Sequence, residues 1–201
     1  MNPNFKETIP VRKLVVTAMM AAISTVLMML SFSVPLVPEF LKMDFSELPA
    51  LITAYTFGPL YGVLVCLVKN LVNLLFTTTM GVGELCNFLL GVCFVLPAGL
   101  IYKKEKSFKG AIIGAVTGTV SMALLSLPLN YFLTYPIYMK FMPEEVILGM
   151  YRAIYPGTKS LLHALTIFNI PFTFVKGLFS VVITFLIYKR LSPLLKGRKG
   201  I

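Results

Sequence analysis

Residues 48–78 read LPALITAYTFGPLYGVLVCLVKNLVNLLFTT, and this stretch decides how many helices the chain has. As one helix it would be about 46 Å long, whereas the hydrocarbon core of a bilayer is about 30 Å thick. Gly58-Pro59 lies inside the stretch. A residue that precedes proline disfavours helix, while proline is well tolerated at the first helical position. The sequence therefore predicts a short helix over about 47–57 and a longer one over about 60–77.

The composition places these helices in a lipid bilayer. Of the 201 residues, 57% are hydrophobic and 13% are charged, whereas a soluble domain carries about 25% charged residues. This excludes an ordinary soluble globule, a disordered chain and a nucleic-acid-binding domain, in spite of the net charge of +10. Because each span needs about 20 residues, we expect an all-α integral membrane protein that forms a single membrane domain over 1–201.

The distribution of charge predicts the topology. Further apolar helices are expected over about 11–34, 84–102, 109–135 and 168–191. Lys and Arg favour the cytoplasmic side of short loops. With six helices and the amino terminus inside, most cations lie on the terminal segments and the 103–109 loop, and few lie outside, namely Lys42, Lys140, Arg152 and Lys159. The pattern predicts a six-transmembrane-helix bundle in the cell membrane, with both termini cytoplasmic.

Motifs for catalysis and for metal binding are missing from the sequence. Cys66, Cys86 and Cys93 have neither metal-site spacing nor a disulfide pattern. There is no phosphate-binding G-x-x-x-x-G-K-[ST] loop and no H-E-x-x-H motif. We therefore expect no catalytic residues, no metal site and no resident cofactor, so the chain is not expected to be an enzyme.

Two lysines fall inside predicted spans, where a charge costs at least about 2.5–3.5 kcal/mol. Lys69 shares a helix face with Asn73, and a buried ion pair with Asp44 or Glu84 would explain it structurally. Lys176 follows Asn169 and Thr173 at spacings of seven and three, so one face of its helix is polar. Lys176 could contact a ligand or form a structural ion pair.

The start of the short helix and Asn130 each have two possible interpretations. Ser46 or Asp44 can cap the short helix, and Asp44 with Glu47 has the spacing of a capping box. The same helix end could also hold a polar ligand. Asn130 lies near the outer end of its helix and must be hydrogen-bonded if it is buried, either to another helix or to a ligand. Glu84 suits the positive end of a helix dipole.

Small residues recur at four-residue spacing on two helices. Ala18 and Ala22 lie on the first, and Gly110, Gly114 and Gly118 lie on the fifth. Such faces let helices approach closely. Packing within the bundle is the simplest explanation, unless the face on the first helix meets another membrane subunit.

Several of these segments, in this order, resemble the substrate-binding S components of energy-coupling factor (ECF) vitamin transporters. The segments are Lys42-Met43-Asp44-Phe45-Ser46-Glu47-Leu48-Pro49, Gly58-Pro59-Leu60-Tyr61-Gly62, Lys69-Asn70 and Gly81-Val82-Gly83-Glu84-Leu85-Cys86-Asn87-Phe88. A fifth, Asn169-Ile170-Pro171-Phe172-Thr173-Phe174-Val175-Lys176-Gly177, is similar to the riboflavin-specific branch. The resemblance covers nearly the whole chain and agrees with six helices.

The resemblance implies a function and partners. Family members bind one vitamin tightly from outside, and work with an EcfT-like membrane scaffold subunit and two cytoplasmic ATPases. Ala18-Met19-Met20-Ala21-Ala22 matches the family motif whose small face, Ala18 and Ala22, meets the scaffold. Thr173 stands where some relatives are expected to have Asn. The resemblance places riboflavin contacts on Leu41, Met43, Asn130 and the face of Thr173 and Lys176. Asp44, at the helix end that could hold a polar ligand, and Asn169, on the same polar face as Lys176, complete the predicted site.

Other functions stay open at this point. FMN or a different vitamin, such as thiamine or biotin, could be the ligand of such a subunit. A self-sufficient carrier or a small membrane enzyme would need an ion-coupling acid or a catalytic constellation, and the sequence offers neither.

Overall fold

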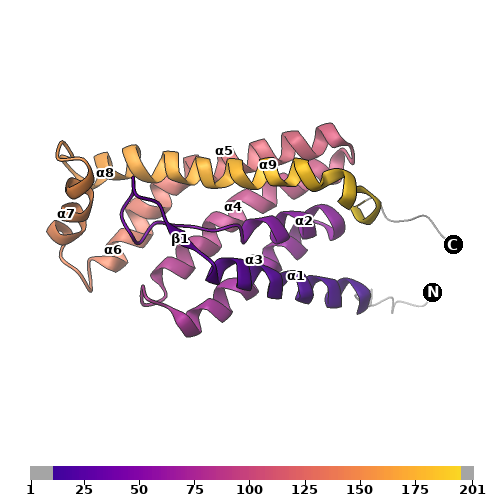
Figure 1. Cartoon of the computed structure of the whole chain (residues 1–201), viewed down its shortest axis with the longest axis horizontal. Coiled ribbons are helices and arrows are strands. Elements are labelled where there is room, and N and C mark those ends of the chain that lie inside the picture. Colours follow the sequence, from indigo (N-terminus) through magenta and orange to yellow (C-terminus); the bar gives the residue numbers. More distant parts are fainter. Residues whose placement is uncertain (1–10, 196–201) are drawn as a thin grey trace, which may run out of the picture.

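The described chain, residues 11–195 of a computed structural model, is a bundle of helices that run roughly along one long axis (Figure 1). Side chains are described up to residue 186. The elements are α1 (Val11–Met29), β1 (Phe32–Ser33), β2 (Lys42–Met43), α2 (Glu47–Phe57), α3 (Pro59–Asn73), η1 (Leu74–Phe76), α4 (Val82–Lys104), α5 (Phe108–Leu129), η2 (Asn130–Thr134), α6 (Tyr135–Tyr138), α7 (Glu144–Ile154), α8 (Leu161–Ala164), η3 (Leu165–Asn169) and α9 (Ile170–Leu195).

Five segments of the described chain are long and apolar enough to cross a bilayer. They are Val11–Met29, Pro59–Phe76, Val82–Lys104, Phe108–Tyr138 and Leu161–Leu186. Helix α2 has only 11 residues, a length of about 16 Å. Since the only strands described are the two residues each of β1 and β2, the molecule is an all-α membrane protein with one short hairpin.

The break expected at Gly58-Pro59 separates α2 from α3. Gly58 has φ 111°, which glycine adopts readily because it lacks a Cβ atom, and its N–H donates to Ala54 O at the end of α2. Pro59 is then the first residue of α3. The chain reverses here, so that α2 packs against α3 instead of extending it.

Several helix ends differ from the predicted ranges. The first helix ends at Met29 instead of about residue 34, because β1 pairs with β2 and takes up residues 32–33. The last helical segment begins at Leu161, not about 168, since Ser160 caps α8 and η3 continues into α9. Helix α5 passes through η2 into α6 and so extends beyond 135. Between α6 and α8 the chain forms the further helix α7, which has no counterpart among the predicted helices.

The glycines of α5 lie against α4. A Cβ atom at Gly118 would be 2.4 Å from Phe94 O, and one at Gly114 would be 2.7 Å from Ala98 O. These distances are too short for any side chain, so the two backbones approach as closely as the small-residue pattern allows. Gly110 faces the Glu105 carbonyl of its own preceding loop instead.

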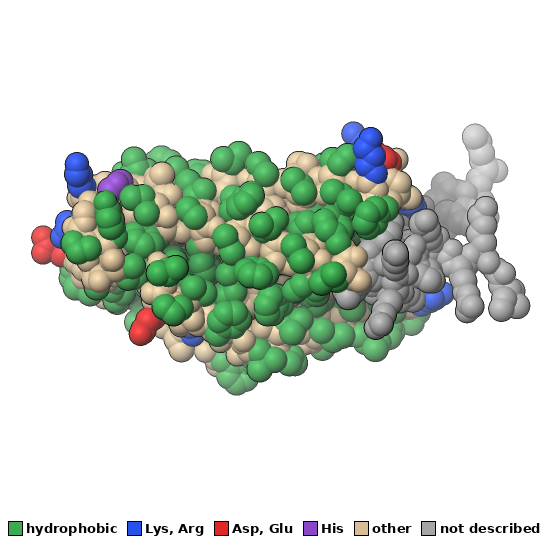
Figure 2. All heavy atoms as spheres, turned by 45° about the horizontal axis from the view of Figure 1, so that its top comes forward, with side chains coloured by type: hydrophobic (Ala, Val, Ile, Leu, Met, Phe, Trp, Pro, Cys, Tyr) green, Lys and Arg blue, Asp and Glu red, His purple; other side chains and the backbone are tan. Residues whose placement is uncertain are grey.

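The surface supports membrane insertion. Figure 2 shows hydrophobic side chains along the length of the bundle and charged ones mainly towards its ends. Large apolar residues such as Leu60, Leu75, Leu124 and Leu186 are exposed, and a soluble protein rarely leaves an apolar surface of this extent open to water.

Candidate functional site

A cavity of about 510 Å³ is lined by residues of the β1–β2 hairpin, α6 and the neighbouring helix ends. The hairpin and α6 lie towards the same end of the bundle (Figure 1). This volume is within the range of small-molecule sites. Apolar side chains line part of it, namely Met28, Met29, Phe40, Leu41, Phe76, Leu90, Met122 and Phe172. Polar and charged side chains from the hairpin, α4, α5–η2 and α9 complete the lining. The cavity therefore combines an apolar slot with a few polar groups.

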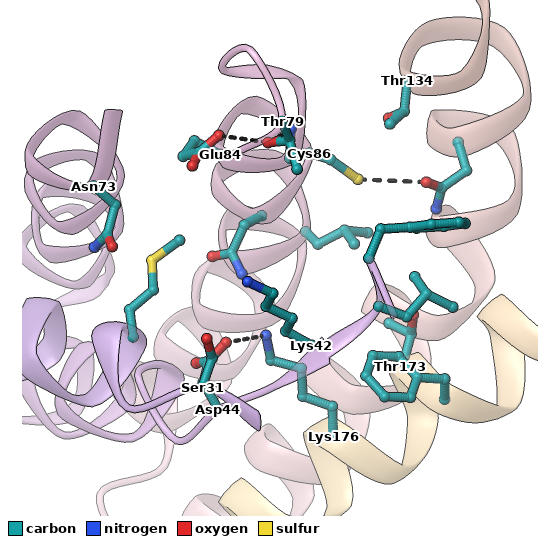
Figure 3. Close-up of a pocket in the computed structure, with 18 of the residues that line it drawn as sticks. Ser31, Lys42, Asp44, Asn73, Thr79, Glu84, Cys86, Thr134, Thr173 and Lys176 are labelled. Atoms are coloured by element: carbon teal, nitrogen blue, oxygen red, sulfur yellow. Dashed lines mark hydrogen bonds and ion pairs between the residues drawn. The ribbon is translucent and has the colours of Figure 1, made fainter. Parts of the chain in front are cut away.

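The end of η3 and the start of α9 contribute a polar face. Asn169, Thr173 and Lys176 all line the cavity and are buried. The ammonium group of Lys176 donates to Asp44 Oδ2 at 2.8 Å, which joins α9 to the segment before α2 (Figure 3). Lys176 thus both borders the cavity and forms an ion pair, so the two interpretations of this residue are compatible.

Asp44 is fixed from two sides. Its Oδ1 accepts from the backbone N–H and the hydroxyl of Ser46, and its Oδ2 accepts from Lys176. Burial disfavours the charged carboxylate, but Lys176, Lys69 and these hydrogen bonds outweigh that effect and lower the pKa of Asp44 to about 2. The Asp44 carboxylate therefore keeps its charge next to the cavity.

The predicted capping box at the start of α2 is absent. Ser46 is the N-cap residue, yet its side chain makes no capping hydrogen bond. Glu47 instead accepts from Lys69 Nζ at 2.6 Å. The prediction that Lys69 pairs with Asp44 or Glu84 was therefore wrong. Glu47 takes that role because Gly91 of α4 leaves room for its carboxylate, which lies 3.0 Å from where a Cβ atom would be.

Asn130 and Asn169 each occupy one end of a π-helical turn. Asn130 begins η2 and donates to Ser126 O, and Asn169 ends η3 and accepts from the Tyr151 hydroxyl at 2.7 Å. π-Helical turns occur frequently at functional sites. Here they place two amides on the cavity wall from helices that are otherwise apolar.

Not every predicted ligand residue borders the cavity. Leu41, Asp44, Asn130, Asn169, Thr173 and Lys176 line it. Met43 does not: it is 4% exposed and pairs with Phe32 in the hairpin. Because side chains alternate along a strand, Lys42 lines the cavity while Met43 points away from it.

Sequence reasoning missed several lining residues, namely Lys42, Thr79, Thr134, Tyr135 and Tyr138. It assigned Glu84 to the dipole of α4, but the Glu84 carboxylate also lines the cavity and accepts from Thr79 (Figure 3). It accepts from Thr77 as well. The run Thr77-Thr78-Thr79 before the Gly81-Val82-Gly83 turn was a usable signal. Short polar side chains next to a turn often hydrogen-bond to the nearby backbone and so fix the conformation of the loop.

Ala18 and Ala22 lie away from the core. Both are exposed on α1, whose buried residues are Thr17, Ala21, Ser24 and Thr25. Within the described residues, the small face of Ala18 and Ala22 is therefore not used for packing, unlike the glycine face of α5.

Three comparisons identify relatives of the chain. Residues 12–188 match the family "ECF transporter, substrate-specific component". The riboflavin transporter RibU of Staphylococcus aureus (strain TCH60) is 37% identical over 186 residues, covering 92% of this chain and 93% of that protein. The riboflavin transporter FmnP of Bacillus subtilis (strain 168) is 34% identical over 193 residues, covering 94% and 97%.

A solved structure has a similar fold. It is described as "Structure and mechanism of the S component of a bacterial ECF transporter", with 36% sequence identity and a TM-score of 0.73. The match covers 92% of this chain and 98% of that one.

Proposed function

The chain belongs to the substrate-specific components of ECF transporters, and we propose that it captures riboflavin in the cavity for import. Membership of this family makes the chain a transport subunit rather than an enzyme. The observation that carries the choice of ligand is that relatives 37% and 34% identical over nearly the whole chain are riboflavin transporters.

The cavity's chemistry fits this ligand. A flat isoalloxazine ring needs an apolar slot, which Leu41, Met122 and Phe172 would provide. The dione edge of the ring needs a few fixed hydrogen-bonding groups. Asn130, Thr173 and Lys176 are the candidates, and Asp44 holds the Lys176 ammonium group in place. Asn169 completes this wall, whereas Met43 is buried in the hairpin and does not line the cavity.

We further propose six membrane-embedded helices, with α2 as the short sixth one, both termini cytoplasmic and the cavity facing outside. Support comes from the segment 103–109, which contains four lysines and lies at the same end of the bundle as the start of α1 and the end of α9 (Figure 1). Lys6, Lys196, Arg198 and Lys199, which contribute to this argument, lie outside the described residues, as do the side chains of Lys189 and Arg190.

The exposed Ala18 and Ala22 face of α1 is the proposed contact for an EcfT-like scaffold subunit, through which two cytoplasmic ATPases would supply energy. A small face allows close approach of a second helix in the membrane. FMN remains a possible second ligand of the cavity. Thiamine and biotin are less well supported, because the relatives reported above are riboflavin transporters.

Purification from cells tests the ligand. The protein should carry a yellow flavin, or should quench flavin fluorescence when riboflavin is added. A colourless protein that does not respond to riboflavin would contradict the proposal.

Lys176→Ala tests the position of the binding site. Riboflavin affinity should fall about ten- to hundredfold, since hydrogen bonds from charged groups contribute about 1.5–3 kcal/mol. Thr173→Val should also weaken binding without leaving Asp44 unpaired. Lys159→Ala, a change at an exposed outer lysine, should have no effect. Unchanged affinity in both cavity variants would show that the site lies elsewhere.

A further inference from the structure

We propose that Glu84 is the hydrogen-bond acceptor for the hydroxyl groups of riboflavin's ribityl chain, and that its charge favours the free vitamin over its phosphate ester. This inference rests on the proposed function, because it assigns a second part of the same ligand. It concerns the side of the cavity opposite the α9 wall.

The Glu84 carboxylate is held in one orientation. Its Oε2 accepts from Thr77 Oγ1 at 2.9 Å and from Thr79 Oγ1 at 3.0 Å. The two hydroxyl oxygens in turn accept backbone N–H groups, from Gly81 at 3.0 Å and from Gly83 at 3.1 Å. A hydroxyl has one hydrogen to donate, and the shortest acceptor contact of each threonine hydroxyl is with Glu84, compared with 3.4 Å between the two hydroxyls. The loop thus orients the carboxylate before any ligand arrives.

The backbone conformation of this loop also helps to place Thr77 and Thr79 next to Glu84. Met80 and Gly81 have φ values of 54° and 83°, so the chain doubles back between the threonines and α4. A positive φ is uncommon for a residue other than glycine. The turn brings Thr77 and Thr79 over the first turn of α4, where Glu84 lies.

Glu84 also differs in charge balance from the other carboxylates of the cavity. Asp44 is paired with Lys176, and Glu47 is paired with Lys69. Within the described residues, Glu84 has no ion pair, and its Oε1 has no hydrogen-bond partner. A carboxylate can only accept hydrogen bonds, so the group that binds there must be a donor. The hydroxyl groups of a polyol are such donors.

The position of Glu84 suits the far end of a long ligand. In Figure 3, Glu84 and Thr79 lie across the cavity from Lys176 and Thr173. With the dione edge of the ring on α9, the ribityl chain would extend towards α4. A terminal phosphate would then approach an unneutralised carboxylate, and like charges repel. Lys42, also in the lining, is the cation that would offset part of this repulsion.

The experiment compares three flavins: riboflavin, FMN and lumiflavin, which has the ring but no polyol. Dissociation constants are measured by flavin fluorescence quenching for the unmodified chain, Glu84→Ala, Glu84→Gln and the control Glu145→Gln. Glu145 is an exposed acid of α7 that does not line the cavity. Lumiflavin binding reports whether each variant retains its fold and its ring site.

Glu84→Ala should weaken riboflavin about tenfold and leave lumiflavin within about twofold. Glu84→Gln keeps an acceptor and the side-chain shape, so riboflavin should weaken less, while the affinity for FMN relative to riboflavin should rise about fivefold or more. The control should match the unmodified chain for all three flavins.

The experiment distinguishes a failure of the proposed function from a failure of the role assigned to Glu84. An unmodified chain that binds none of the three flavins overturns the proposed function. Equal weakening of riboflavin and lumiflavin by Glu84→Ala, or no weakening of either, overturns only the ribityl assignment. An unchanged ratio of FMN to riboflavin affinity in Glu84→Gln overturns the charge argument.

Discussion

Ser46 connects two buried ion pairs at the start of α2. Its hydroxyl accepts from Lys69 Nζ at 2.6 Å and donates to Asp44, which in turn holds Lys176. Lys69 also donates to Glu47, and all of these side chains are buried. Charged groups in such a network depend on one another, because removing one leaves its partner without compensation.

Lys69→Met should therefore be strongly destabilising. The substitution leaves Glu47 as an uncompensated buried charge, so the free energy of unfolding should fall by about 3–5 kcal/mol. Thermal unfolding in detergent micelles, followed by circular dichroism, measures the loss. The double variant Lys69→Met/Glu47→Leu removes both charges and should recover most of the stability. An equal loss in the single and double variants would contradict the ion-pair explanation.

The fold should lose stability at low pH because Asp44 becomes protonated. Its pKa is lowered from 3.8 to about 2, although burial alone would raise it. A carboxyl group whose pKa is lower in the folded state than in the unfolded state stabilises the fold at pH values above its unfolded-state pKa. That stabilisation is lost as the pH falls through its folded-state pKa. About 2 kcal/mol of stability should be present above pH 3.8 and disappear as pH falls to about 2. Unfolding temperatures over this window check the prediction, and Asp44→Asn should not show the decline.

At the scale of elements, the contact of α4 with α5 depends on Gly118. A methyl group there would be 2.4 Å from Phe94 O and 3.0 Å from the Phe94 ring. Gly118→Ala should therefore separate the two helices and lower stability by about 1–3 kcal/mol, in spite of the better helix propensity of alanine. Gly149→Ala is the matched control, because nothing lies within 4 Å of its Cβ position in α7. The control should be neutral or up to about 1 kcal/mol more stable, as measured by thermal unfolding; a Gly118→Ala variant equal to the control would contradict the packing argument.

The helix break at Gly58-Pro59 was predictable because its signals are local. Proline restricts its own backbone and that of the preceding residue, and glycine permits the positive φ that the break requires, so the sequence alone contains the information. The end of α1 was predicted too late, at about 34, since the pairing of β1 with β2 joins Phe32 to Met43 and Ser33 to Lys42, which are not neighbours in the sequence. The start of the last helical segment was also missed, because Ser160 caps a short turn that precedes a π-helical one.

At the scale of the whole molecule, residue types were easier to predict than their partners. A lysine inside a span must have a partner, and that requirement was predictable for Lys69 and Lys176. Its identity depends on how distant helices pack: Glu47 of α2 reaches Lys69 of α3, and its carboxylate lies against Gly91 of α4. The position of Met43 also depends on long-range packing. Met43 was predicted to contact the ligand, but it is buried in the β1–β2 hairpin and does not line the cavity.

The cavity and the outer face of α1 are linked through the start of α2. Ser24 of α1 donates to Ser46 O, next to the charges that hold Lys176. Ser24 is buried, while Ala18 and Ala22 lie on the exposed side of the same helix. One helix therefore contacts the start of α2 through Ser24 and exposes Ala18 and Ala22, the surface proposed for the scaffold subunit, on its other side.

Ala18→Trp separates these two sides. A bulky ring on the exposed face does not enter the core, so riboflavin affinity should stay within about twofold of the unmodified chain, as fluorescence quenching would show. The same ring prevents close approach of a second helix, so riboflavin uptake by cells that express the scaffold and ATPase subunits should fall at least about tenfold. Leu124→Trp provides the control, because Leu124 is 65% exposed on α5 and should tolerate the ring with normal uptake. Normal uptake by Ala18→Trp would place the partner surface on another helix, and a loss of riboflavin binding would show that α1 supports the cavity and not only the partner.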